Sequence, residues 1–112
     1  MLPVILKYRP ITPLNPSMKV IMRFLVPRLR EKLGYELEVV LDAPRATFKD
    51  LLDMLDEEYG GVKEAILDQG GWNLKKGILA MVNGVDIKHL GGLKAELKDG
   101  DKVLIFPPLG GG

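Results

Sequence analysis

Two stretches in the first half of the chain carry apolar residues at every second position, as β-strands do. From Lys19 to Val26 both faces are largely apolar, with Val20, Met22, Phe24 and Val26 on one side and Ile21 and Leu25 on the other. A strand that is apolar on both faces is typical of the interior of a sheet. From Tyr35 to Leu41 only one face is apolar, which predicts an antiparallel hairpin partner with one wetter face. We interpret Arg28–Gly34, which follows Pro27, as a charged connection between these strands.

A helical pattern follows the second strand. The Thr47 hydroxyl is placed to cap the backbone N–H of Asp50, and the Asp50 carboxylate would lie near the positive end of the helix. The apolar residues then recur at helical spacing, with acidic residues between them: Phe48, Leu51, Leu52, Leu55 and Tyr59. Gly60-Gly61 is expected to end this helix, and 62–67 to add a short helical turn before a loop over 69–73.

The remaining strands are separated by strong turn signals. Asn83-Gly84 lies between the apolar runs 78–82 and 85–87, which predicts a tight hairpin. After a short segment over 93–97, the last strand covers 102–106 and stops at Pro107-Pro108. This order predicts an α+β fold in which one main helix covers a mixed sheet. The first and last strands are both apolar on two faces, so we expect them to lie centrally, side by side and parallel.

The length and composition indicate one globular domain with an extension at each end. The chain has 112 residues, of which 46% are hydrophobic and 28% are charged. Four prolines in residues 1–17 exclude a regular helix there, so we read this part as an N-terminal Pro-rich arm or an extra edge segment. Residues 18–108 form the expected domain, and 109–112 form a flexible glycine tail.

Several classes of function are disfavoured by what the chain lacks. Sixteen basic and fifteen acidic residues give a formal charge of +1, so there is no broad basic field for nucleic acid. There is no Cys, and the chain has one His (His89) and one Ser (Ser17). Most hydrolase and metal sites therefore lack the residues they would need. No apolar run is long enough to cross a membrane, and the first residues do not resemble a cleavable signal. We expect a cytoplasmic protein that binds neither nucleic acid nor membrane.

The most unusual feature is the C-terminal sequence Phe106-Pro107-Pro108-Leu109-Gly110-Gly111-Gly112. Beyond the stiff Pro-Pro pair, four residues reach at most about 13 Å, and the last three carry no Cβ. Such a tail can enter a narrow channel and present the Gly112 carboxylate inside a partner protein. A carboxylate is a poor electrophile, so acyl chemistry requires activation by another enzyme with ATP, as an acyl phosphate or acyl adenylate. The chain itself needs no catalytic side chain for this, and the alternative is that the glycines are only a frayed end.

From Lys19 to Gly112 the sequence resembles the MoaD/ThiS family of ubiquitin-like sulfur carriers, in its molybdopterin synthase small-subunit branch. The resemblance rests on the order and spacing of several motifs: Leu29-Arg30-Glu31-Lys32-Leu33-Gly34, Val82-Asn83-Gly84-Val85-Asp86-Ile87, Leu90-Gly91-Gly92-Leu93, Leu97-Lys98-Asp99-Gly100-Asp101-Lys102-Val103, and Phe106-Pro107-Pro108 before the terminal glycines. Gly110 stands where the family often has Ala or Ser, and residues 1–17 have no counterpart in the family pattern.

The resemblance implies a β-grasp fold and a carrier that is not itself an enzyme. It implies that a partner related to ubiquitin-activating enzymes joins Gly112 to AMP, using ATP, and that sulfur then replaces AMP to give a thiocarboxylate. No cofactor would be bound directly. Gly110 and Gly111 would complete the tail, which enters the large subunit of molybdopterin synthase, while Phe106, Pro107, Pro108 and Leu109 would contact partners on the sheet face.

Two other hypotheses remain open at this point. Archaeal ubiquitin-like modifiers share the fold and the tail, so Gly112 would instead be joined to target lysines. A β-grasp binding module with a chemically silent tail is the third. We interpret His89 as a solvated loop residue, whereas Trp72 has two equally good readings, as an exposed partner anchor or as a lid over the core.

Overall fold

The computed structural model describes residues 4–6, 18–41, 43 and 45–108, and for residues 4–6 only the backbone. Its helices and strands, in chain order, are β1 (Val4–Leu6), β2 (Met18–Phe24), α1 (Pro27–Leu33), β3 (Glu36–Leu41), β4 (Ala46–Thr47), α2 (Phe48–Tyr59), α3 (Val62–Ile66), β5 (Leu79–Val82), β6 (Val85–Asp86), the 3₁₀ turns η1 (Ile87–His89) and η2 (Gly92–Lys94), β7 (Glu96–Leu97) and β8 (Lys102–Phe106). The two strands β4 and β7 form a small separate pair.

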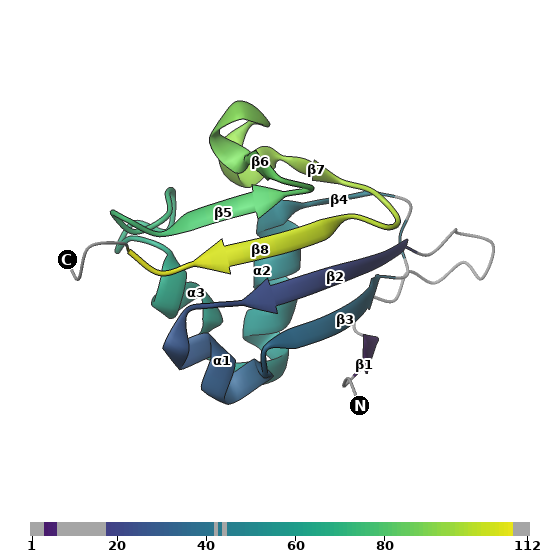
Figure 1. Ribbon diagram of the computed structural model, residues 1–112, viewed down its shortest axis with the longest axis horizontal. Coiled ribbons are helices and arrows are strands. Elements are labelled where there is room, and N and C mark those ends of the chain that lie inside the picture. The colour runs from purple at the N-terminus through teal and green to yellow at the C-terminus, as the bar shows by residue number, and fades with distance from the viewer. Residues whose placement is uncertain (1–3, 7–17, 42, 44, 109–112) are drawn as a thin grey trace.

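The main sheet has the strand order β1-β3-β2-β8-β5-β6. β2 pairs with β3 in antiparallel and with β8 in parallel orientation, and β5 pairs with β8 in antiparallel orientation. The prediction that the first long strand and the last strand lie centrally, side by side and parallel is therefore confirmed. The sheet is mixed, with α2 crossing behind it in Figure 1, which is the predicted β-grasp arrangement.

The hydrophobic core fills the space between the sheet and the helices. On β2 and β8 every second side chain is buried, and on α2 the buried residues follow the predicted stripe (Met22, Phe24, Phe48, Leu51, Leu52, Leu55, Val103 and Ile105). Each buries its whole side chain, which contributes roughly 1.5–3 kcal/mol apiece for residues of this size. The helices thus pack against only one face of the sheet.

Helix α2 begins as the sequence predicted. The Thr47 hydroxyl accepts a hydrogen bond from the Asp50 backbone N–H at 3.1 Å, and the Asp50 carboxylate accepts one from the Thr47 N–H at 2.9 Å. At the other end, Gly60 and Gly61 take positive φ angles of 73° and 74°. The Lys32 ammonium donates to the Gly60 carbonyl at 3.0 Å, so a cation stabilises the negative end of the helix.

The interpretation of Arg28–Gly34 as a charged connection is wrong, because residues 27–33 form helix α1. Pro27 occupies the first turn, where its missing N–H costs nothing. Leu29 and Leu33 are four residues apart and both are buried against the core, while the charged residues between them face solvent. Two apolar residues were too few to distinguish this short helix from a loop by periodicity.

The turn over residues 98–101 ties the start of β8 to its neighbours. The Asp101 side chain is buried and accepts hydrogen bonds from the Asn83 side-chain amide at 2.8 Å and from the Lys98 N–H at 2.7 Å. Asp99 accepts the Lys19 N–H at 2.8 Å. The two carboxylates therefore connect this turn to β2 and to the Asn83-Gly84 turn.

Strand β1 adds to the outer edge of the sheet. It pairs in parallel with β3, with Val4 opposite Glu38 and Leu6 opposite Val40. The rest of the predicted arm, residues 1–3 and 7–17, lies outside the described residues, as does the tail over 109–112. The division of the chain into arm, domain and tail stays a prediction.

We predict that Thr47→Ala lowers the free energy of unfolding by about 1 kcal/mol, because it removes the hydroxyl that caps α2. Thr47→Ser keeps the cap and should be close to neutral. Urea unfolding of the three proteins measures the difference. An equal loss in both variants would show that the methyl group of Thr47, and not the cap, is what stabilises this end.

Candidate functional site

The candidate site is the end of β8, where the chain leaves the sheet. The Leu25 N–H donates to the Ile105 carbonyl at 2.9 Å on one side, and Leu79 pairs with Phe106 on the other. The strand is therefore held on both sides up to its last residue. Phe106 and Pro107 are partly buried and Pro108 is exposed. The predicted residues Leu109, Gly110, Gly111 and Gly112 lie outside the described residues.

One residue at this exit was missed by sequence reasoning. Gly77 lies two residues before β5, and by continuation of the Leu79–Phe106 register it stands opposite Pro108. A Cβ on Gly77 would lie 2.8 Å from the Pro108 Cβ, which is closer than real Cβ atoms come to other atoms. Nothing in the order of residues along the chain pointed to this contact, because it depends on the strand register.

The face of the sheet opposite the helices carries an apolar surface beside the exit. We call it the outer patch, and define it by six partly buried residues: Ile21, Leu25, Leu79, Met81, Leu104 and Phe106. They alternate with the fully buried residues of the same strands, as predicted for Leu104 and Phe106 against Val103 and Ile105. Figure 1 looks onto this face, with β2, β8 and β5 in front and no helix crossing them.

Charged residues lie beside and among the residues of the outer patch, with Arg23 next to Leu104 in the register of β2 and β8. Arg23 donates to Glu36 at 2.7 Å, and Lys19 lies 3.7 Å from Glu38. These pairs are solvent-exposed and contribute little to stability. A hollow of about 270 Å³ lined by Leu25, Pro27, Arg30 and Glu31 adjoins the patch. The surface thus combines partly exposed apolar side chains with charged pairs, and protein interfaces contain both.

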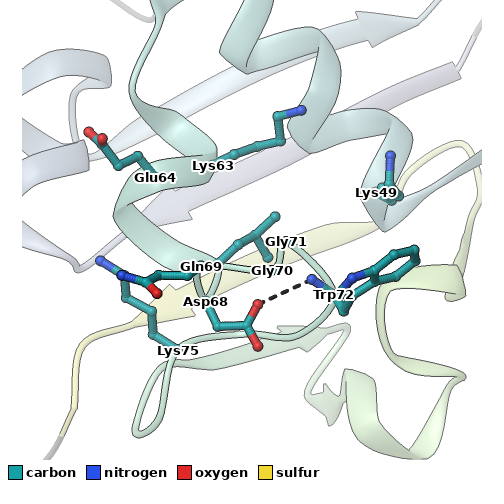
Figure 2. Close-up of a pocket in the computed structure, with 10 residues that line it drawn as sticks. Lys49, Lys63, Glu64, Asp68, Gln69, Gly70, Gly71, Trp72 and Lys75 are labelled. Carbon is teal, nitrogen blue, oxygen red and sulfur yellow. Dashed lines mark hydrogen bonds between the residues drawn. The ribbon is translucent and has the colours of Figure 1, made fainter.

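A second hollow lies away from this exit, at the loop over 68–72. It encloses about 820 Å³, and its lining includes Lys49, Lys63, Lys75 and Trp72. Figure 2 shows Trp72 and Lys49 at one end and Gln69 and Lys75 at the other. Trp72 is 78% exposed, so the reading in which it covers the core is wrong. Its backbone N–H donates a hydrogen bond to the Asp68 carboxylate at 3.2 Å, and its ring packs against Gly70.

Two of the three lysines of this hollow contact the same carboxylate, that of Asp53. Lys49 and Lys63 each lie 2.9 Å from Asp53. Burial of Asp53 raises its pKa, but the hydrogen bonds from Lys63 and Lys49 outweigh burial and bring the pKa below its usual value. The hydrogen bond to Asp53 likewise raises the pKa of Lys63. Asp53 stays ionised at neutral pH and offsets part of the positive charge, so the hollow carries little net field.

The described residues contain no group of three or more His, Asp or Glu side chains that could hold a metal ion. His89 is exposed in η1, as expected. None of the helices in the described part has the length and apolar content needed to cross a bilayer. What this site can supply is a docking surface and the chain that continues from it.

A central strand that ends beside an apolar sheet face, opposite a crossing helix, defines a ubiquitin-like β-grasp protein. The sequence model of the ThiS family matches residues 25–112. The chain therefore belongs to the ThiS family, and its relatives are sulfur carriers and small ubiquitin-like modifiers. The resemblance stated from the sequence motifs is confirmed.

Three relatives illustrate the range of the family. Small archaeal modifier protein 3 of Haloferax volcanii is 37% identical over 67 residues, which cover 60% of this chain and 71% of that protein. The Amycolatopsis orientalis BexX/CysO complex contains a chain 31% identical, with a TM-score of 0.65 and coverage of 83% of this chain and 99% of that one. A Pyrococcus furiosus protein assigned as molybdopterin converting factor, subunit 1, is 28% identical, with a TM-score of 0.59 and coverage of 82% and 99%.

We predict that the two faces of β8 respond differently to truncation. Ile105→Ala should lower the free energy of unfolding by about 2–5 kcal/mol, because Ile105 is fully buried under the helices. Leu104→Ala on the outer patch should cost about 1 kcal/mol or less, since its side chain is already partly hydrated. Urea unfolding compares the two, and a larger loss for Leu104 would mean that the outer patch belongs to the core.

Proposed function

We propose that the chain is a sulfur carrier that works through the carboxyl group of Gly112 and donates sulfur in molybdopterin biosynthesis. The observation that carries the proposal is the join between β8 and the C-terminal residues. A central strand, paired on both sides, is followed in the sequence by Pro107-Pro108-Leu109 and then by three glycines without Cβ atoms. Membership of the ThiS family and the Pyrococcus relative support the choice of pathway.

The chemistry takes two steps, both catalysed by a partner. In the first, the Gly112 carboxylate attacks the α-phosphorus of ATP, an acyl adenylate forms and pyrophosphate leaves. In the second, hydrosulfide attacks the acyl carbon, AMP leaves with the C–O bond electrons, and the proton of the sulfur is lost to solvent. The chain is then a substrate and not an enzyme, binds no cofactor directly, and relies on an enzyme related to ubiquitin-activating enzymes for ATP.

The outer patch is the surface we propose for the partners. It lies beside the end of β8, so a protein that covers it can receive the residues that follow Pro108 in the same encounter. The structure of the BexX/CysO complex contains a relative of this chain with another protein, which supports protein partners for this fold. For this chain we propose the adenylating enzyme and the large subunit of molybdopterin synthase as successive occupants.

We predict that incubation with ATP, sulfide and the adenylating enzyme of the same organism replaces one oxygen of the Gly112 carboxyl group by sulfur. Mass spectrometry of the C-terminal peptide measures the exchange. A chain lacking Gly111 and Gly112 is the control and should release no pyrophosphate above background. An unchanged mass, with an enzyme shown to be active on another carrier, would contradict the sulfur-carrier proposal.

We predict that Phe106→Ala weakens binding to the adenylating enzyme by about tenfold, the size expected for an aromatic anchor at an interface. Val40→Ala is the matched control, because Val40 lies on the same face of the sheet, opposite Lys19 and away from the tail. Leu109→Asp should also weaken binding while the free energy of unfolding stays unchanged. Titration calorimetry measures the affinity of each variant for the adenylating enzyme. Equal affinities for the Phe106 and Val40 variants would place the interface elsewhere.

The second candidate is a protein modifier joined through Gly112 to target lysines. The observation that favours it is the 37% identity to a small archaeal modifier protein. Both candidates pass through the same adenylate and differ in the group that attacks it, which is sulfur in one case and a lysine ε-amine in the other. Peptides from cell extracts in which Gly112 is joined to a lysine side chain would support the modifier, and their absence alongside a thiocarboxylate would exclude it.

A further inference from the structure

We infer that Gly77 is a positioning residue for the proposed carrier reaction. Its Cα, which carries no side chain, packs against the Pro108 ring, and we call this contact the seat. The seat sets the direction in which the chain leaves the sheet at Pro108. The inference rests on the proposed function, since it concerns how Gly112 reaches the adenylating enzyme. It assigns a role to a residue that lies outside the tail and outside the outer patch.

The contact between Gly77 and Pro108 is closer than any other residue type would allow. A Cβ at position 77 would lie 2.8 Å from the Pro108 Cβ, 3.1 Å from its Cγ and 3.3 Å from its Cα. These atoms belong to a closed ring and to backbone, so they cannot turn aside as the end of a flexible side chain can. Gly77 also has a φ of +90°, which L side chains rarely adopt.

The seat itself is held in place by the fold. The Lys75 N–H donates to the Ile66 carbonyl at 2.8 Å at the end of α3, and the Ile78 N–H donates to the Lys75 carbonyl at 3.0 Å. Two residues after Gly77, Leu79 pairs with Phe106 in the sheet. Gly77 is thus fixed between α3 and β5, two elements packed on the core.

The exit needs such a seat because neither proline of the Pro-Pro segment can donate a backbone hydrogen bond. Proline fixes φ near −65° and holds the preceding residue in an extended conformation, but it has no N–H to bond to a neighbouring strand. Past Phe106 the direction of the chain depends on packing. The four residues beyond Pro108 reach at most about 13 Å, so the position and direction of Pro108 limit where the Gly112 carboxylate can lie. Misplacement of a reacting group by even 1 Å is enough to slow a reaction about a hundredfold.

Gly77→Ala tests the seat, and Gly100→Ala is its matched control. Gly100 has nearly the same φ, +89°, and a Cβ there would meet nothing within 4 Å. Both variants carry the same backbone strain, but only the first displaces Pro108. Gly77→Ala should lower the free energy of unfolding at least as much as Gly100→Ala, because the clash with Pro108 adds to the shared strain. Urea unfolding of both variants confirms that each is folded under the conditions of the reaction.

The measurement is the rate of pyrophosphate release by the adenylating enzyme with each full-length variant as substrate. Gly77→Ala should lower kcat by roughly tenfold to a hundredfold. Its KM should stay within about twofold of the natural chain, because the outer patch still binds. Gly100→Ala should change both constants by less than about twofold. In a Pro108→Gly background, which removes the ring, Gly77→Ala should have almost no further effect, the mark of a coupled pair.

Each alternative result overturns the inference in a recognisable way. If Gly77→Ala reacts like Gly100→Ala, or if its effect persists in full without the Pro108 ring, the glycine does not act through Pro108. If KM rises while kcat is unchanged, Gly77 belongs to the docking surface and not to the exit. If the natural chain itself releases no pyrophosphate with an active enzyme, the proposed function fails, and the inference fails with it.

Discussion

The parallel pairing of β2 with β8 is the constraint on which the rest of the structure depends. Four residue pairs join a strand near the start of the chain to the last strand, from Ile21 with Lys102 to Phe24 with Ile105. Everything between them must fit on the two sides of this pair: β3 extends the sheet beyond β2, and β5 extends it beyond β8. Such distant pairing is costly in chain entropy, and it is offset by the full burial of Met22, Phe24, Val103 and Ile105 under the helices.

The same pairing gives the molecule its two unlike faces and its exit. Because the helices cover one face only, the alternation along β8 leaves Leu104 and Phe106 on the other, where they form the centre of the outer patch. Because β8 is central, the chain leaves the sheet between β2 and β5, beside that patch and against Gly77. Under the proposed function, a partner that binds the patch would find the end of β8 directly beside it, which is how a fold can serve a carrier.

Much of this arrangement was predictable from the sequence, and the failures have physical causes. The capping pair Thr47–Asp50, the Asn83-Gly84 turn and the two-sided apolar strands each have a local signature. From these signatures followed the two hairpins and the parallel pairing of β2 with β8, but not the pairing of β5 with β8. Helix α1 was missed because only Leu29 and Leu33 mark its buried side. The seat at Gly77 was missed because it is a contact between residues that only the sheet register brings together. The exposure of Trp72 was equally undecided, since a loop sequence does not reveal what lies beneath it. The tail, by contrast, was recognisable only from its residues, Gly110 to Gly112.

The central claim is that the folded domain serves to present one carboxyl group, and the most direct test compares the domain with its own tail. The adenylating enzyme would be given either the full chain or a synthetic peptide of residues 106–112, and kcat/KM for pyrophosphate release would be measured for each. The account predicts at least a thousandfold lower value for the peptide, about 4 kcal/mol of transition-state stabilisation, because the outer patch and the fixed exit are missing. A peptide that reacts as well as the full chain would contradict it, since the fold would then contribute nothing to the reaction.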